Sequence, residues 1–300
     1  MLRHRAVLLA LAALFSACAG HEPAPEPAPS LPPIALRAVG DSVMYLEQTE
    51  THTVIERPSD TLLIQSSQTA VLHVVRTAPD TLQAFYEHLS LRFSTPSAER
   101  NIDTGALIGP RFVLHEDDGR ITTVSAPALP EEIRQLTDLR RQFDDFFLRT
   151  QGRTLAPGEE WVDSLDMSAA EGEAGTDRRT VTRFRVRGDT AVYGIAGRIV
   201  EYESAIEASL HTAPTRDGVL RSSLTGGENG FFVYSAERAV MLLRQRVGVL
   251  EGEITVEGNF ETVHLPQAYT YQSRVALIPP DQPGLVLPHE ALPPAPTPQP

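Results

Sequence analysis

Apolar and polar residues alternate through most of the chain between residues 43 and 277, which is the pattern of half-buried strands. Short groups of Gly, Asp, Pro and Ser separate the alternating segments and favour turns. We therefore predict antiparallel strands over residues 43–55, 61–75, 112–115, 121–124, 180–187, 190–193, 199–211, 219–225, 231–234 and 268–277. Residues 80–93 stay open, because their apolar positions fit either a helix or a strand.

The sharpest strand signal predicts a hairpin near the C-terminus. Residues 240–250 and residues 253–263 both alternate, and Glu251-Gly252 lies between them. A two-residue loop with glycine suits a tight hairpin turn. The register that follows places Val247 on the buried face and Arg246 on the exposed face.

One segment has the pattern of a helix. Pro130-Glu131-Glu132 suits a first helical turn, because proline is tolerated there and acidic groups favour the positive end of the helix dipole. The apolar stripe that follows comprises Ile133, Leu136, Phe143, Phe146 and Phe147. We expect a sheet face to cover this stripe. The predicted fold is therefore mainly β: a large curved antiparallel sheet or half-barrel with one central amphipathic α-helix packed on it.

The N-terminus has the three-part layout of a secretory signal. Two arginines lie within residues 1–5, an apolar run covers residues 6–15, and small residues follow. The apolar run is about half the ~20 residues that span a bilayer. We therefore expect residues 1–17 to be a signal peptide and the body to be exported.

Cys18 is the only cysteine and lies where the apolar run ends. Leu14-Phe15-Ser16-Ala17-Cys18 resembles the signal of bacterial lipoproteins, in which a large aliphatic residue and two small ones precede a cysteine. Phe15 departs from the family, which most often has leucine there, and Ala17-Cys18-Ala19 also fits ordinary signal cleavage. The resemblance implies that Cys18 is diacylated, becomes the new N-terminus and carries a further acyl chain such as palmitate. Because Ala19 follows the cysteine, it also implies a cell-envelope location, in the outer membrane facing the periplasm or the cell surface.

Proline-rich segments bracket the body. Six of the chain's 24 prolines lie in residues 22–33 and nine lie in residues 279–300. Such segments favour extended polyproline II and do not enter the interior of a sheet or helix. We predict a lipid-anchored linker over residues 18–33, a β-rich body over residues 34–278 and a disordered tail over residues 279–300.

Composition and charge exclude several classes of function. The formal net charge is −13, which argues against binding to the phosphate backbone of nucleic acids. All 26 basic residues are arginine, so neither a Schiff-base lysine nor a P-loop lysine exists. With one cysteine, neither an intramolecular disulfide nor a thiolate zinc site can form.

Candidate catalytic or metal-binding residues are few. His115-Glu116-Asp117-Asp118 is the densest metal-capable group, but adjacent strand residues point to opposite faces and Asp-Asp-Gly suits a turn. The histidines of the body stand singly, and the sequence contains no recognised catalytic spacing. We therefore expect no metal site, no cofactor and no enzyme activity.

Two further groups are candidates for ligand binding. Arg183, Arg185 and Arg187 share one strand face, where they would either bind an anion or pair with acidic groups such as Glu201 in solvent. Trp161 would either fill the core or form an aromatic wall of a ligand groove.

The order of strands, helix, Pro157-Gly158-Glu159-Glu160-Trp161 and strands loosely resembles bacterial envelope lipoproteins with one long curved sheet, including carriers of the LolA/LolB type. The resemblance carries no functional residues across. Three functions follow for the body. It would bind a hydrophobic small molecule in a groove that the helix leaves open, act as a structural or protein-interaction module with a closed core, or, least favoured, be a hydrolase with an unusual site.

Overall fold

The structure is a computed structural model that describes residues 35–128, 142–150, 152–171, 174–212, 218–258 and 261–279. All of these residues belong to one compact unit within residues 34–300. The predicted signal peptide, Cys18 and the linker lie outside the described residues, as does all of the predicted tail after residue 279.

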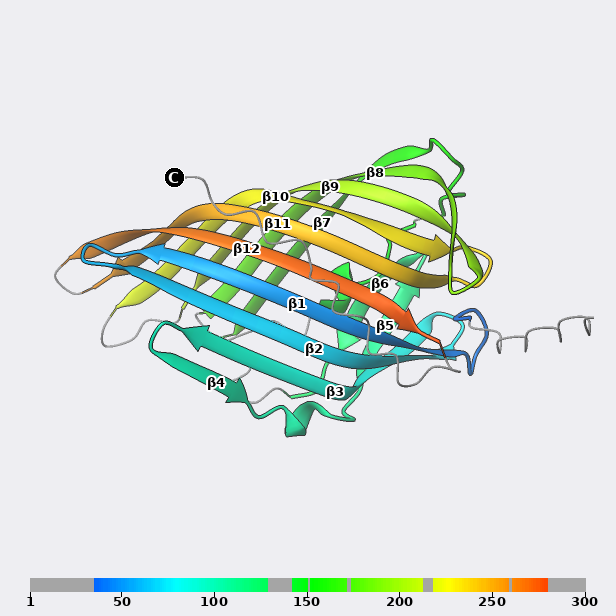
Figure 1. The fold of residues 1–300 in the computed structure, drawn as a ribbon, viewed down its shortest axis with the longest axis horizontal. Coiled ribbons are helices and arrows are strands. Elements are labelled where there is room, and N and C mark those ends of the chain that lie inside the picture. Colours follow the sequence, from blue (N-terminus) through cyan, green and yellow to red (C-terminus); the bar gives the residue numbers. More distant parts are fainter. Residues whose placement is uncertain are drawn as a thin grey trace, which may run out of the picture. The chain divides into compact units, whose positions relative to one another are not determined.

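The described residues form one antiparallel sheet of 12 strands (Figure 1). In chain order the strands are β1 (Ser42–Glu56), β2 (Thr61–Ala78), β3 (Thr81–Thr95), β4 (Ala98–Ile102), β5 (Phe112–Asp117), β6 (Arg120–Ser125), β7 (Glu160–Glu171), β8 (Ala174–Val192), β9 (Ile195–His211), β10 (Val219–Ser235), β11 (Val240–Glu257) and β12 (Thr262–Ile278). Across the sheet the order is β6-β5-β3-β2-β1-β12-β11-β10-β9-β8-β7, with β4 beside β3. The prediction of a mainly β body with a large antiparallel sheet is confirmed.

The strands that begin the body have turns where the sequence predicts them. Residues 57–60 separate β1 from β2, and Asp118-Gly119 separates β5 from β6 with both φ angles positive, at 47° and 76°. Residues 80–93, which the sequence leaves open, belong to strand β3.

Three segments that separate predicted strands instead continue as strands. Gly188-Asp189 lies inside β8, residues 226–230 lie inside β10, and Glu251-Gly252 lies inside β11. The predicted hairpin of residues 240–250 with 253–263 is therefore wrong.

β11 pairs instead with β10 and β12 along its length, and Val247 lies opposite Gln272 of β12. Gly252 lies where β10 and β11 approach each other closely: a Cβ there would lie 1.9 Å from the carbonyl oxygen of Ser223. The glycine is needed because the neighbouring backbone is near, and a turn is not required to explain it.

The predicted central α-helix is also not supported. Among the described residues there is no α-helix, only the 3₁₀ turns η1 (Gly105–Leu107) and η2 (Gln142–Asp145); residues 129–141 lie outside them. Arg244 Nη1 donates to the carbonyl oxygens of Asp145 and Phe146, at 2.7 and 3.1 Å. These carbonyls are thereby engaged by a side chain of the sheet, outside the hydrogen-bond pattern of a helix.

The phenylalanines of the predicted stripe nevertheless pack on the sheet as predicted, whereas Ile133 and Leu136 lie outside the described residues. Phe143 and Phe146 are 0% and 1% exposed. The Phe143 ring lies 5.0 Å from Phe112 of β5, and the Phe146 ring lies 5.6 Å from Tyr45 of β1, both edge to face. We call residues 142–150 the strap, and the sheet face that carries Tyr45 and packs against the strap the inner face.

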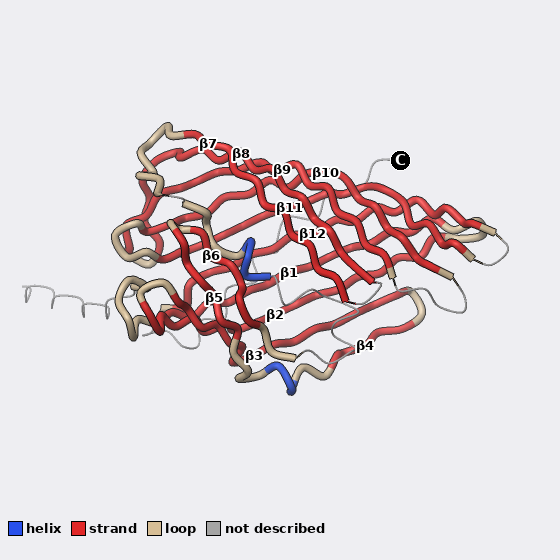
Figure 2. Tube along the Cα trace, turned by 180° about the vertical axis from the view of Figure 1, so that it is seen from behind, coloured by secondary structure: helices blue, strands red, loops and turns tan. Residues whose placement is uncertain are grey.

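The strap connects the two ends of the sheet, which do not pair with each other among the described strands. Asp144 accepts a hydrogen bond from the backbone nitrogen of Thr123 in β6, and Arg149 forms a 3.0 Å ion pair with Asp163 in β7. Figure 2 shows η2, in blue, next to β6 and in front of the sheet. The strap and the β5–β6 hairpin thus cover one part of the inner face. The described helical turns include none long and apolar enough to span a membrane.

Candidate functional site

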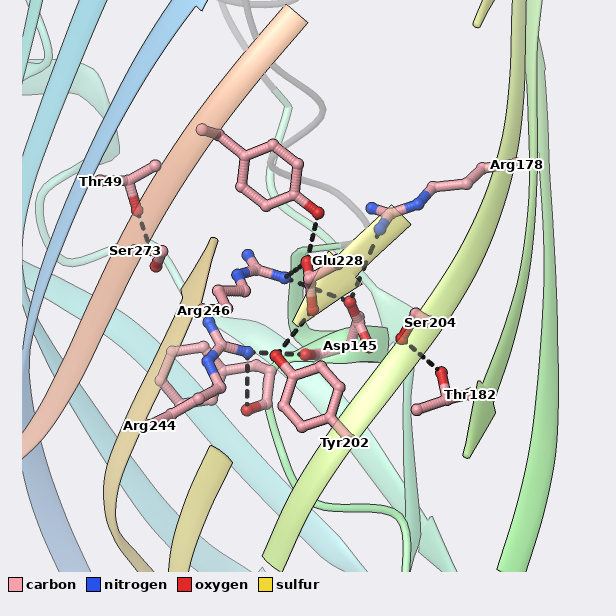
Figure 3. A network of polar contacts seen from close by, with 12 residues as sticks. Thr49, Asp145, Arg178, Thr182, Tyr202, Ser204, Glu228, Arg244, Arg246 and Ser273 are labelled. Carbon is pink, nitrogen blue, oxygen red and sulfur yellow. Dashed lines mark hydrogen bonds and ion pairs between the residues drawn. The ribbon is translucent and has the colours of Figure 1, made fainter. Parts of the chain in front are cut away.

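A buried carboxylate, Glu228 of β10, lies at the centre of a polar cluster on the inner face (Figure 3). Its exposed fraction is 4%. Tyr202 of β9 donates a 2.7 Å hydrogen bond to one carboxylate oxygen, and Tyr271 of β12 donates to the other. Arg246 Nη1 of β11 lies 3.4 Å from that second oxygen. Four adjacent strands therefore meet at one carboxylate.

Glycines make this arrangement possible. Tyr202 pairs with Gly230 and Tyr271 pairs with Gly248 in the sheet register. A Cβ at Gly248 would lie 2.2 Å from the Tyr271 ring, and a Cβ at Gly230 would lie 2.6 Å from the Tyr202 hydroxyl. Each tyrosine ring thus lies across a glycine of the neighbouring strand, which directs its hydroxyl to Glu228.

Both carboxylate oxygens of Glu228 have hydrogen-bond or ion-pair partners. Burial, and then the charge of Glu228, raises the pKa of Tyr202 and Tyr271 well above its usual range, so both hydroxyls keep their protons. Burial alone would lower the pKa of Arg246, but Glu228 together with Tyr271, Asp145 and Tyr202 outweighs it and raises that pKa. A buried carboxylate with this many donors is paired, as burial of a charge requires. Glu228 therefore holds strands together.

Asp145 of the strap lies between two arginines. Its Oδ2 is 3.2 Å from Arg246 Nη1 and 3.9 Å from Arg178 Nη2. Burial by itself would raise the pKa of Asp145, but the surrounding arginines, Arg178 first and Arg246 second, outweigh it and lower the pKa. The carboxylate is held in its charged form.

Glu47 of β1 is the third acid on this face. Only one side-chain hydrogen bond, from Gln68 Nε2 at 3.3 Å, reaches it in the described structure. Burial raises its pKa; Arg244, Arg246 and the Gln68 hydrogen bond act in the opposite direction without cancelling the effect. Burial thus disfavours the charged form of this acid.

A cavity of about 560 Å³ lies on the inner face beyond the strap. Its apolar lining residues come from both halves of the sheet: Ile64, Leu91, Phe93, Met167, Ala208, Leu210, Leu224 and Tyr269. Its polar lining residues include Glu47, Thr49, Thr51, Thr53, Ser66, Gln68, Asp145, Arg178, Arg244 and Arg246. Solvent reaches the cavity, because Leu210 is 41% exposed and the Arg178 side chain is 31% exposed. A volume of this size suits a small-molecule ligand.

The candidates from sequence lie elsewhere. Arg183, Arg185 and Arg187 belong to the outer face, where Arg185 pairs with Glu160 at 3.2 Å and Arg187 with Glu201 at 2.6 Å. They border an open hollow of about 670 Å³ together with these acids.

Trp161 lies on the inner face, buried and stacked on Phe184 at 4.8 Å, and does not line the 560 Å³ cavity.

His115-Glu116-Asp117-Asp118 does not converge on one point. His115 lies 3.7 Å from Asp80, whereas Glu116 pairs with Arg76. Across the residues the structure describes, no group of three or more His, Cys, Asp or Glu side chains is placed to hold a metal ion.

Sequence reasoning missed the residues that matter here. It placed Arg246 on the exposed face of a hairpin, and it did not single out Glu228, Tyr271 or Arg178. The only local signal was glycine within an alternating segment, at Gly248 among others, which marks a close approach as well as a turn.

No protein-family model and no curated protein matches the chain. Among solved structures, one of lipid–protein interactions in lipovitellin matches 81% of this chain at 11% identity with a TM-score of 0.42, and the chain spans 25% of that protein. Neisserial surface protein A matches 79% of this chain and 98% of its own at 9% identity and a TM-score of 0.21. The translocator domain of the autotransporter NalP from Neisseria meningitidis matches 80% of this chain over 88% of its own length, at 10% identity and with a TM-score of 0.23. Similarity this low carries no function across to this chain.

Proposed function

We propose that the protein is a lipid-anchored cell-envelope protein that binds a small molecule with a hydrocarbon part in the inner-face cavity. The observation that carries this proposal is the cavity of about 560 Å³ next to a well-packed core. The strap and its phenylalanines cover one part of the inner face and leave this part open. Apolar side chains such as Phe93 and Leu224 would gain stability by contact with a hydrocarbon, at about 25 cal/mol per Å² buried.

The alternative, a structural or protein-interaction module with a closed core, accounts less well for the cavity. A module of that kind needs no solvent-accessible hollow lined on two sides by leucine, isoleucine and phenylalanine. The charged side chains that line the cavity, such as Arg178 and Arg246, indicate that the ligand also has a polar part. A purely hydrophobic ligand would leave these charges without water.

Two alanines of β9 allow a direct test. Ala208 lines the cavity, whereas Ala205 lies three residues away on the exposed outer face. We expect Ala208→Trp to fill the cavity and to weaken binding of Nile red, a neutral solvatochromic dye, at least about tenfold. Ala205→Trp in the same full-length chain should bind the dye as the unchanged protein does.

Native mass spectrometry of the purified protein should also release a bound amphiphile from the unchanged chain and from Ala205→Trp, but not from Ala208→Trp. Absence of both dye binding and a released molecule in the unchanged chain would show that the cavity is not a ligand site. Equal unfolding midpoints of the two variants exclude misfolding as the cause of any difference.

The lipid anchor rests on the sequence around Cys18, which resembles a lipoprotein signal. A diacylated cysteine followed by residues 19–33 would hold the body near a membrane surface. That location would give a binding protein access to membrane amphiphiles.

A further inference from the structure

Three guanidinium groups at the cavity have donors that the described residues do not use. The Nε atoms of Arg178, Arg244 and Arg246 are all buried without a hydrogen-bond partner, and all three side chains line the cavity. Arg178 and Arg246 also lie within 4 Å of the same Asp145 oxygen. An unpaired buried donor on a charged group is costly, so an acceptor that a ligand brings to one of these guanidinium groups would strengthen binding.

Arg178 is the more available of the two. Its side chain is 31% exposed, against 18% for Arg246. Its Nη2 is 3.9 Å from Asp145, which is longer than a hydrogen bond. Arg246 is instead shared between Asp145 and Glu228. Arg178 is therefore the more exposed cation of the two and the less engaged by carboxylates.

The charges around the cavity favour an anion. Three arginines, Arg178, Arg244 and Arg246, lie around two carboxylates, Asp145 and Glu228. Arg244 donates to backbone carbonyls, and among the described residues no carboxylate forms an ion pair with it. The third acid, Glu47, is buried in surroundings that disfavour its charge. Asp177, the other acid of the cavity lining, is exposed and accepts a hydrogen bond from Ser168, so the three guanidinium groups outnumber the carboxylates that face them, Asp145 and Glu228.

Apolar side chains lie directly beside Arg178. In the sheet register it is flanked by Met167 of β7 and Ala208 of β9, and Leu224 follows on β10. All four line the cavity. A single row across the sheet thus offers a cation and a hydrocarbon surface side by side.

Resting on the proposed binding function, we propose that the ligand is an anionic amphiphile, whose oxyanion head lies against Arg178 and Arg246 and whose hydrocarbon lies on Met167, Ala208 and Leu224. A carboxylate or a phosphate monoester both have the geometry that a guanidinium fork recognises.

The test compares ligands that differ only in the head, added to the full-length chain below their micelle-forming concentrations. We expect dodecanoate and dodecyl phosphate to bind at least about tenfold more tightly than dodecanol, which corresponds to one charge-assisted hydrogen bond. Arg178→Gln should remove that advantage and leave dodecanol affinity unchanged. Arg178→Lys, which keeps the charge but loses the fork, should give an intermediate loss.

Arg179→Gln is the matched control, because Arg179 lies on the outer face with its side chain 65% exposed. It should bind every ligand as the unchanged chain does. Equal affinity of the unchanged chain for dodecanoate and dodecanol would overturn the anionic head while leaving the proposed function intact. Failure of all three amphiphiles, dodecanol included, would overturn the proposed function. If inorganic phosphate binds as tightly as dodecyl phosphate, the site binds free anions, and the proposal of an amphiphilic ligand is wrong.

Discussion

Gly248 and Gly230 are the residues that determine how the buried tyrosines reach Glu228. Each glycine lies opposite a tyrosine on the next strand and leaves room for its ring. The cost of glycine in a strand, about 0.5–1 kcal/mol relative to alanine, is offset by the hydrogen bonds that the tyrosines then donate.

We predict that Gly248→Ala destabilises the protein by about 1–3 kcal/mol, because the new methyl group would overlap the Tyr271 ring and displace it from Glu228. Chemical denaturation measures the change in unfolding free energy. Gly188→Ala is the control, since a Cβ at Gly188 meets no atom within 4 Å. That substitution should be neutral or slightly stabilising. Equal losses in both variants would contradict the role assigned to Gly248.

Glu47 gives a prediction with a defined pH dependence. Its folded pKa is raised, so its contribution to stability is fully present below the unfolded glutamate value of about 4.3 and is lost as pH rises through the folded value. Glu47→Gln keeps a neutral side chain at every pH. The variant should therefore match the unchanged protein near pH 4 and become relatively more stable as pH rises towards 7.

The pKa of Asp145 is shifted in the opposite direction, so its titration does not obscure the effect of Glu47 between pH 4 and pH 7. Its folded pKa is lowered, so its contribution is present above about pH 4 and is lost only as pH falls through the folded value. Unfolding free energies of both proteins, measured between pH 4 and pH 7, test the prediction. A stability difference that does not change with pH would contradict it.

At the scale of elements, the strap replaces the predicted helix as the cover of the inner face. Its phenylalanines fill the space between β1 and β5, and its polar side chains bond to β6 and β7. Buried apolar area, rather than regular helical hydrogen bonding, therefore fixes this segment.

We predict that Phe143→Ala costs about 3–5 kcal/mol, since the ring is fully buried against Phe112 and Phe146. Val162→Ala, at a 59% exposed position of β7, should change the unfolding free energy by less than about 0.5 kcal/mol. Both values come from denaturant titration. A small loss for Phe143→Ala would mean that the strap is not part of the folded core.

At the scale of the whole molecule, the proposed anchor and the proposed cavity are separate functions of separate segments. We expect Cys18→Ser to move the protein from the membrane fraction to the soluble fraction and to abolish incorporation of labelled fatty acid. Because the cavity is built from strands of the body and from the strap, the soluble variant should retain dye binding. Continued membrane association of the variant, with no fatty acid on the unchanged protein, would contradict the anchor.

The sequence alone determined that the body is mainly β and where several of its strands lie. Alternation located β1, β2, β5 and β6, because a half-buried strand needs only local order to place its apolar side chains on one face. The buried phenylalanines of the strap were also evident, since large aromatic side chains must be covered wherever the backbone leads them.

Only the tertiary structure decided which glycines turn the chain and which allow close packing. Gly119 and Gly252 have similar local sequence signals, yet the first lies in a turn and the second lies against Ser223 of the next strand. The same decision set the site: once β11 continues through Gly252, Arg246 faces inward, where Glu228 and Asp145 from distant segments pair with it. Alternation fixes which residues share a face, but the identity of the buried face depends on what the rest of the chain brings against it.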